Sequence, residues 1–226
     1  MKRTVLFITG TDTGVGKTVL ATHLVRRLVE RSVATRAFKP LASGGRFDAE
    51  SLHAALGGGL PLAVVSPWYF RAPIAPVLAA RRKGRRVVLA EVVGHIRQHA
   101  HGATVVVVEG AGGLLSPLGA DFDNRDLLVA LRACPLIVAP NRLGAVNQVR
   151  LVLAALPSGT RKRAVVVLVG HPRPAAIERS NAELLGEGFD AWRIHRWPWL
   201  ARQGATAPRK LRRRLDDLLR AAGVPG

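Results

Sequence analysis

Apolar runs alternate with stretches of helical period along most of this chain. The apolar runs predict six strands, at residues 4–9, 34–38, 104–109, 135–139, 164–169 and 191–195. Amphipathic spacing predicts six helices, at residues 17–31, 48–57, 88–100, 143–156, 174–187 and 208–222. The runs at 104–109 and 164–169 are almost wholly aliphatic, which is typical of strands buried on both faces of a parallel sheet.

This alternation predicts an α/β fold, with a three-layer, doubly wound and mostly parallel sheet. The 226 residues are interpreted as a single domain, in which the order of residues 200–226 is left open. In such folds ligands bind beyond the carboxyl ends of the strands. Residues with useful chemistry are therefore expected directly after strands.

The sequence GTDTGVGKT at residues 10–18 joins the first predicted strand to the first predicted helix. A turn of this kind directs backbone N–H groups and a helix N-terminus at phosphate oxygens. Lys17 is expected to reach the β- and γ-phosphates, and Thr18 to offer its hydroxyl to Mg²⁺. The usual motif has its first glycine at the position of Thr11, whereas this chain has Gly10. The pattern predicts a nucleoside triphosphate site in a P-loop NTPase-like fold; the alternative is an ordinary turn with a solvated lysine.

Further candidates follow the second and third predicted strands. Glu109 ends a buried strand, where a carboxylate needs a cation or hydrogen bonds, and Mg²⁺ shared with Thr18 would supply the cation. Asp48 is interpreted as a third metal ligand, with a plain helix cap as the alternative. Lys39 is expected beside the γ-phosphate unless it is a surface lysine. The pair at 112–113, Gly112 and Gly113, lets backbone approach a ligand unless it only forms a tight turn.

Composition narrows the class of protein. Hydrophobic residues make up 48% of the chain, but no apolar run approaches the ~20 residues that span a bilayer. We therefore expect no membrane association, and no targeting segment before the phosphate loop. Cys134 is the only cysteine, which is compatible with the cytoplasm, the expected location.

The formal net charge is +19, and arginine-rich runs occur at residues 81–86, 161–163 and 209–214. A field of this sign attracts polyanions without specificity. The runs lack interleaved aromatic residues and any nucleic-acid recognition motif, so nucleic acid is expected to bind only non-specifically. The alternative is a set of solvated helix faces and loop ends.

Three histidines, His95, His99 and His101, invite a metal interpretation. His95 and His99 lie one turn apart on a predicted helix. No carboxylate or cysteine is spaced to complete a site, so a structural or solvated role is expected.

Taken together, these motifs resemble those of dethiobiotin synthetase, a ligase of biotin biosynthesis. The resemblance runs from about residue 5 to 150. It rests on six segments of the sequence: GTDTGVGKT at 10–18, KPLASG at 39–44, DA at 48–49, PIAP at 73–76, VEGAGGLL at 108–115 and LGAVN at 143–147. The phosphate loop alone would indicate only a wider superfamily that includes partitioning ATPases and cobyrinic-acid amidating enzymes.

The resemblance implies an activity. 7,8-Diaminopelargonic acid takes up CO₂ as a carbamate, which attacks the γ-phosphate of ATP. The second amine then closes the cyclic urea of dethiobiotin and releases phosphate. ATP, or another nucleoside triphosphate, and Mg²⁺ are the implied ligands.

The resemblance also implies roles for residues. Lys17 and Lys39 would act in catalysis, with Thr13 and Ser43 contacting the carbamate or the substrate amines. A homodimer is implied, in which Gly144, Ala145, Val146 and Asn147 of the second subunit receive the substrate carboxylate; Ser43, Gly112 and Gly113 complete the substrate site. The metal ligands are Thr18, Asp48 and Glu109. Nucleotide contacts are assigned to Asp12, Gly14, Val15, Gly16, Lys17, Thr18, Val19, Gly170 and Pro198, the last within a WPWL segment interpreted as a wall near the base.

Three positions depart from the family pattern. The expected base-reading Asn is replaced by Gly170, which offers only backbone groups, so we expect relaxed base selectivity with CTP among the nucleotides used. Val77 stands where a histidine usually follows the PIAP segment, and Gln148 where a histidine ends the Gly144 motif.

Three other functions stay open on the sequence. A DNA-binding partitioning ATPase would suit the basic charge, although Thr11 and Asp12 stand where such proteins carry an early lysine. A related ligase could use a different acceptor. A divergent paralogue could bind nucleotide without catalysis.

Overall fold

A computed structural model describes residues 3–173, 177–200 and 209–224. Its central sheet has six strands in the order β2-β5-β1-β6-β7-β8, and every neighbouring pair is parallel. The strands are β1 (Thr4–Gly10), β2 (Thr35–Phe38), β5 (Val105–Glu109), β6 (Cys134–Pro140), β7 (Val165–Val169) and β8 (Ile194–Trp197). The predicted α/β fold with a doubly wound parallel sheet is confirmed.

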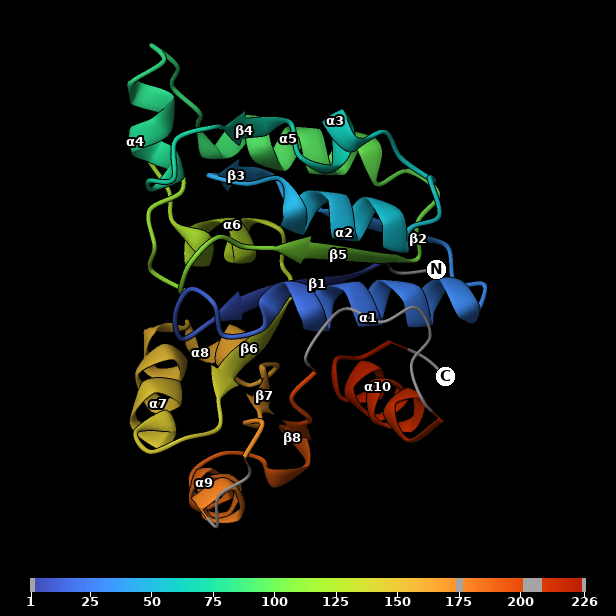
Figure 1. Cartoon of the computed structure of the whole chain (residues 1–226), viewed down its shortest axis with the longest axis vertical. Helices are drawn as coiled ribbons and strands as arrows, with labels where there is room; N and C mark the ends of the chain where they lie inside the picture. The colour runs from blue at the N-terminus through green and yellow to red at the C-terminus, as the bar shows by residue number, and fades with distance from the viewer. Residues whose placement is uncertain (1–2, 174–176, 201–208, 225–226) are drawn as a thin grey trace.

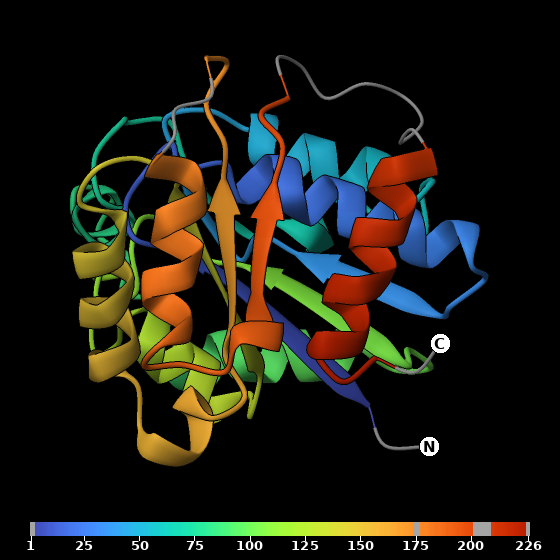
Figure 2. The same ribbon diagram turned by 90° about the horizontal axis from the view of Figure 1, so that it is seen from below.

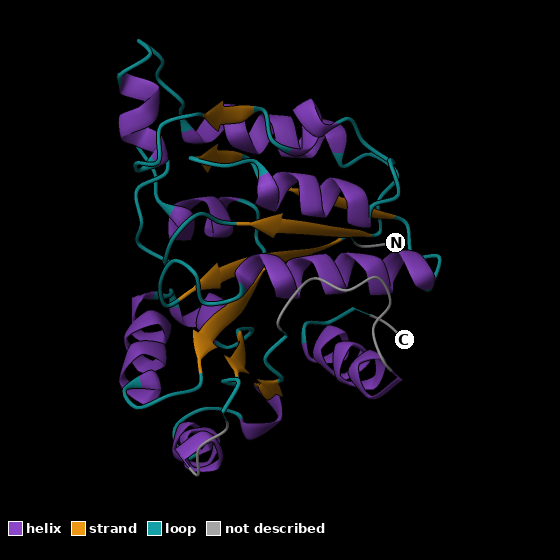
Figure 3. Ribbon diagram, viewed as in Figure 1, coloured by secondary structure: helices purple, strands orange, loops and turns teal. Residues whose placement is uncertain are grey.

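Helices cover both faces of this sheet (Figure 1, Figure 3). Figure 2 shows α7 (Ala145–Ala155) and α9 (Ile177–Gly186) on one side of β7 and β8, and α10 (Arg209–Ala221) on the other. α1 (Lys17–Glu30) packs beside α10, and α5 (Leu89–His99) packs against α6 (Asn124–Ala130). The result is three layers, helix on sheet on helix.

A second, two-stranded sheet lies beside the main one. β3 (Leu41–Ser43) pairs in parallel with β4 (Trp68–Phe70), close to α2 (Phe47–Ala55), α3 (Leu62–Val65) and α4 (Pro76–Arg81) (Figure 1). The sequence predicted no helix or strand at residues 39–47 or 58–87, where β3, α3, β4 and α4 lie. Elements of three to six residues are too short to show a hydrophobic period, which explains why they were missed.

Most predicted elements agree with the structure within a few residues. The last strand does not: residues 191–193 form a 3₁₀ turn, in which the Arg193 amide donates to the Asp190 carbonyl, and β8 starts at Ile194. α6 and the single turn α8 (Ser158–Arg161) were not predicted. Residues 174–176 and 208, at the starts of two predicted helices, lie outside the described residues.

The buried apolar side chains form one continuous cluster. All four valines of β5 are fully buried, as are Leu20, Leu24 and Leu28 on the inner face of α1. This burial on both faces explains the aliphatic runs of the sequence. Within the described residues, no helix is both long and apolar enough to cross a membrane.

Candidate nucleotide and metal site

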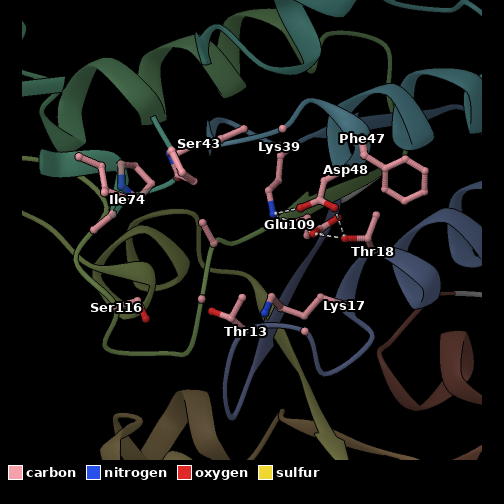
Figure 4. A pocket seen from close by; sticks show the side chains of 18 of the residues that line it. Thr13, Lys17, Thr18, Lys39, Ser43, Phe47, Asp48, Ile74, Glu109 and Ser116 are labelled. Atoms are coloured by element: carbon pink, nitrogen blue, oxygen red, sulfur yellow. Dashed lines mark hydrogen bonds and ion pairs between the residues drawn. The ribbon is translucent and has the colours of Figure 1, made fainter. Parts of the chain in front are cut away.

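A cavity of about 760 Å³ opens beyond the carboxyl ends of β1, β2 and β5. It is lined by residues of the phosphate loop, of the segments after β2 and β5, and of the PIAP segment (Figure 4). Predicted site residues in its wall are Thr13, Gly14, Gly16, Lys17, Thr18, Val19, Lys39, Ser43, Asp48, Glu109 and Gly112. Residues from three separate segments, 13–19, 39–48 and 109–112, thus meet at one edge of the sheet, as the topology predicted.

The phosphate loop requires its glycines for two different reasons. Gly14 and Gly16 have φ values of 73° and 99°, a region that favours glycine. A Cβ on Gly10 would lie 2.6 Å from Val15 Cγ2, so only glycine lets the loop fold back over the end of β1. This close approach accounts for the glycine at position 10.

Lys17 is the first residue of α1 and lies across its own loop. Its Nζ donates to the Asp12 carbonyl at 2.8 Å, and its side chain is buried. Burial, with Lys39 as a second cause, lowers the pKa of Lys17 to about 8. Phosphate oxygens would supply the negative charge that this buried ammonium lacks.

Four charged or polar side chains, from α1, α2, β5 and the segment after β2, converge on the other side of the cavity (Figure 4). Glu109 Oε1 lies 2.8 Å from Lys39 Nζ and 2.8 Å from Thr18 Oγ1. Asp48 contacts the same two partners, with Oδ1 at 2.8 Å from Thr18 Oγ1 and Oδ2 at 3.0 Å from Lys39 Nζ. Lys39 also donates to the Gly110 carbonyl at 2.9 Å.

The burial of Lys39 and Glu109, and the position of Asp48 in α2, resolve two of the alternatives left by the sequence. Lys39 and Glu109 are 4% and 1% exposed, so Lys39 is not a surface lysine. Burial alone would lower the pKa of Lys39, but the carboxylates of Glu109 and Asp48 outweigh it and raise that pKa. Burial would likewise raise the pKa of Asp48, yet Lys39 holds it below its usual range. Asp48 is the second residue of α2, not its cap.

The oxygen set around Thr18 suits a small divalent cation. A hydroxyl has one proton, so Thr18 can donate to only one of the two carboxylates that lie 2.8 Å from its oxygen. Glu109 Oε2 is buried with no hydrogen-bond partner. Two carboxylates and one hydroxyl leave further positions for phosphate and water oxygens, which is the way Mg²⁺ is usually held.

Gly112 and Gly113, in the loop after β5, have different structural roles. Gly112 has φ 74° and lines the cavity. Gly113 packs against the phosphate loop, since a Cβ there would lie 3.4 Å from the carbonyl oxygens of Gly10 and Thr11. The fully buried Asn124 fixes this segment by donating to the carbonyls of Ala111 and Gly113.

Several lining residues were not predicted. Ser116 accepts a hydrogen bond from the Gly113 amide at 2.9 Å, and Phe47 stands 63% exposed beside Asp48 (Figure 4). The others are Ala42, Gly45, Pro73, Ile74, Ala75, Pro76, Ala111 and Pro117. The PIAP segment is recognisable as a motif, but a single sequence does not show that it lies beside the strand ends.

Other predicted site residues do not line this cavity in the described part of the chain. Gly144, in a left-handed conformation, begins α7, and the segment from Gly144 to Asn147 lies at the end of β6. Gly170 follows β7, and its amide donates to the Trp197 carbonyl at 2.8 Å. Val169, the residue before Gly170, packs against the phosphate loop. Its Cγ2 atom would lie 3.5 Å from a Cβ added to Gly16.

The remaining nucleotide candidates are Asp12, Val15 and Pro198, none of them among the cavity residues. Asp12 touches the loop itself, with its carboxylate accepting from the Thr13 amide and its carbonyl accepting from Lys17. Within the WPWL segment, Trp197 is 3% exposed and belongs to the core, whereas Trp199 is 46% exposed.

The structure also places the two residues that replace the family's histidines, and the three histidines considered as metal ligands. Val77 is buried in α4 and lines a second cavity, not this one. Gln148 Oε1 is buried without a partner. His95 Nε2 lies 2.8 Å from the Val64 carbonyl, and the ring packs on Trp68. No cluster of three or more His, Cys, Asp or Glu side chains suited to a metal occurs within the described residues.

A phosphate loop between β1 and α1, with a lysine, a threonine and two carboxylates at the same sheet edge, defines a P-loop NTPase. A family model described as an AAA domain matches residues 4–200. The signal recognition particle receptor FtsY of Elizabethkingia anophelis, in complex with GDP, is similar in fold. Its TM-score is 0.53 at 13% identity, over 96% of this chain and 64% of that one.

Proteins of similar sequence identify the family within the P-loop NTPases. The ATP-dependent dethiobiotin synthetase BioD of Anaeromyxobacter dehalogenans is 48% identical over 155 residues, which is 67% of this chain and 70% of the relative. That of Ralstonia nicotianae is 36% identical over 208 residues, 88% of this chain and 90% of the relative. This chain belongs to the ATP-dependent dethiobiotin synthetase family.

Proposed function

We propose that this protein is an ATP-dependent cyclo-ligase that forms dethiobiotin from 7,8-diaminopelargonic acid, CO₂ and a nucleoside triphosphate. The observation that carries the proposal is the convergence of Lys17, Lys39, Thr18, Asp48 and Glu109 on one cavity. Family membership supplies the reaction, and the cavity supplies groups that suit phosphoryl transfer.

The chemistry has three steps. One substrate amine adds to CO₂ and loses a proton, giving a carbamate. A carbamate oxygen attacks the γ-phosphorus, the bond to the β-phosphate oxygen breaks, and a carbamic-phosphoric anhydride forms. The second amine attacks the carbonyl carbon, the C–O bond to phosphate breaks, and the cyclic urea closes with release of phosphate and a proton.

The two lysines stabilise the phosphoryl transfer. Charge spreads over the equatorial oxygens of the transferred group, and preorganised cations lower the barrier because they need no reorganisation. Lys17 would leave the Asp12 carbonyl, 2.8 Å away, for a β/γ-oxygen. Lys39, held by Glu109, Asp48 and the Gly110 carbonyl, faces the carbamate. Thr13 and Ser43 position the carbamate and the amines.

Thr18, Asp48 and Glu109 would hold Mg²⁺, whose charge offsets that of the phosphates when it is bound. Support comes from the unpartnered Glu109 Oε2 and from the single proton that Thr18 offers to two carboxylates. The residues therefore fit the ion.

We propose a homodimer in which α7 of the partner completes the substrate site. Gly144, Ala145, Val146 and Asn147 lie outside the cavity of their own chain, at a helix N-terminus that suits a carboxylate. Leu143 and Leu151 are 78% and 63% exposed on and beside α7, as expected of an apolar contact surface.

Relaxed base selectivity also remains our proposal. The Gly170 amide is already bonded to the Trp197 carbonyl, so it is not available as a donor to a base. Without a side chain at this position, ATP and CTP would differ little. A cytoplasmic location stays a prediction.

The test is an incubation of the protein with diaminopelargonic acid, bicarbonate, Mg²⁺ and either ATP or CTP, followed by mass spectrometry for dethiobiotin. Product that requires both the diamine and a triphosphate is expected. Triphosphate binding without product would favour another acceptor or a non-catalytic paralogue. ATP hydrolysis stimulated by DNA and lost steeply with salt would favour the partitioning ATPase.

A further inference from the structure

A second cavity lies beside α4, lined by other residues of that helix than those at the nucleotide site. Its volume is about 300 Å³, and its walls come from α4, the segment after it, and the loop after β5. The lining residues are Val77, Ala80, Arg81, Arg85, Arg86, Val87, Gly119 and Ala120. α4 stands at the upper left edge of the molecule in Figure 1.

The charged residues that line this cavity are all basic. Arg81, Arg85 and Arg86 line it, and no acidic residue does. No ion pair of these three arginines is found within the described residues, whereas Arg27 and Arg193 each have a carboxylate partner. A guanidinium recognises carboxylate or phosphate oxygens in pairs, so three around one hollow make an anion site.

The floor of the cavity is apolar, and backbone hydrogen bonds join the segments that form its walls. Val77, Ala80 and Val87 are 8%, 3% and 2% exposed. The Arg85 amide donates to the Ala80 carbonyl at 3.0 Å, and the Ala120 amide to the Val87 carbonyl at 2.8 Å. These bonds preform the hollow, which has the size of a small-molecule site.

We propose that this cavity binds a small organic anion, with a short apolar body and carboxylate or phosphate groups held by Arg81, Arg85 and Arg86. The apolar floor favours such a ligand over a bare inorganic ion or an extended nucleic acid backbone. The inference does not depend on the reaction proposed above.

The chain provides a matched control. Arg82 and Lys83 belong to the same basic run and are also exposed, but neither lines the cavity. The variant R81A/R85A/R86A removes the lining charges, while R82A/K83A removes charge from the same run only. All five side chains are on the surface, so both variants should fold.

The test is calorimetric titration of the full chain at fixed ionic strength, with adipate in one arm and butyl phosphate in the other. Mg²⁺ and a non-hydrolysable ATP analogue are kept saturating so that the phosphate loop is filled. One-to-one binding of either probe is expected, and the tighter probe identifies carboxylate or phosphate as the preferred group. In R81A/R85A/R86A the dissociation constant should rise about tenfold or more, and in R82A/K83A by less than about twofold. Equal weakening in both variants would reduce the effect to general surface charge and overturn the proposal, as would the absence of binding by both probes.

Discussion

The two halves of the central sheet differ in how their carboxyl ends are built. At β1, β2 and β5, Lys39 and Glu109 are buried and bonded to each other, and the whole cluster faces one cavity. At β6, β7 and β8, the predicted residues Gly144 and Gly170 lie outside that cavity. The first half is complete within one chain, whereas we propose that the second half needs a partner subunit and a nucleotide to complete it.

Within the described residues, the two halves differ because only the first one contains buried charged side chains, whose charge must be compensated inside the protein. A buried ammonium or carboxylate is costly without a partner, so the first half fixes its geometry through mutual contacts before any ligand binds. The second half presents backbone groups and exposed leucines, whose contacts can be made later. Substitutions in the first half should therefore affect chemistry and stability, and those in the second half substrate binding and assembly.

The largest effect is expected for Lys39→Met. Loss of the ammonium removes charge stabilisation from the transferred phosphoryl group, so kcat should fall about 10²- to 10³-fold. Single-turnover assays of dethiobiotin formation measure this, and nucleotide binding by calorimetry is the control. Unchanged kcat in a folded variant would contradict the role of Lys39.

Glu109→Gln tests the buried pair. Removal of one charge from the 2.8 Å pair with Lys39 should lower the free energy of unfolding by about 3 kcal/mol, the low end for buried pairs because Asp48 still contacts Lys39. The matched control is Asp216→Asn, which breaks the partly exposed 2.8 Å pair with Arg27 and should cost less than about 1 kcal/mol. Urea unfolding gives both values. Equal losses would refute the distinction between buried and surface charge.

The dimer contact proposed for the second half can be tested at its exposed leucines. Leu151→Arg on α7 should dissociate the dimer and raise the KM for diaminopelargonic acid about tenfold or more, while nucleotide affinity stays unchanged. Leu184→Arg on α9, which replaces another exposed leucine, should leave the mass in solution unchanged. Light scattering measures the mass; a monomeric wild type with full activity would rule out the shared site.

The smallest effect concerns acid stability. Burial lowers the pKa values of His23, His95 and His195 below 6.5. The unfolded chain therefore binds more protons below about pH 6.5, so stability is full above that pH and falls as the pH drops, by at most about 1.4 kcal/mol per pH unit for each histidine. Unfolding midpoints at pH 7 and pH 5 measure this slope. His23→Leu should reduce it, and an unchanged slope would exclude His23 as a contributor.

The sequence predicted the first half of the sheet better than the second, for physical reasons. The phosphate loop and Glu109 depend on contiguous residues. A strand, its end and the next turn follow one another in sequence, so a single sequence pattern predicts their geometry. The cluster around Thr18 also followed from topology, because the ends of parallel strands meet at one edge.

What could not be predicted depends on contacts between distant segments. β3 and β4 are three-residue strands with no period to detect. The buried position of Trp197, and the hydrogen bond from the Gly170 amide to its carbonyl, join residues 27 positions apart. Ser116 reaches the cavity only because Asn124 holds the loop after β5 in place.

The central claim is that the cluster in the first half transfers the γ-phosphoryl group to a carbamate. Bicarbonate labelled with ¹⁸O tests it directly, because the carbamate oxygen that attacks phosphorus leaves with the phosphate. Mass spectrometry should find dethiobiotin together with phosphate that carries one ¹⁸O, and Lys39→Met should lose both. Unlabelled phosphate, released without dethiobiotin, would mean that water is the acceptor and would contradict the account.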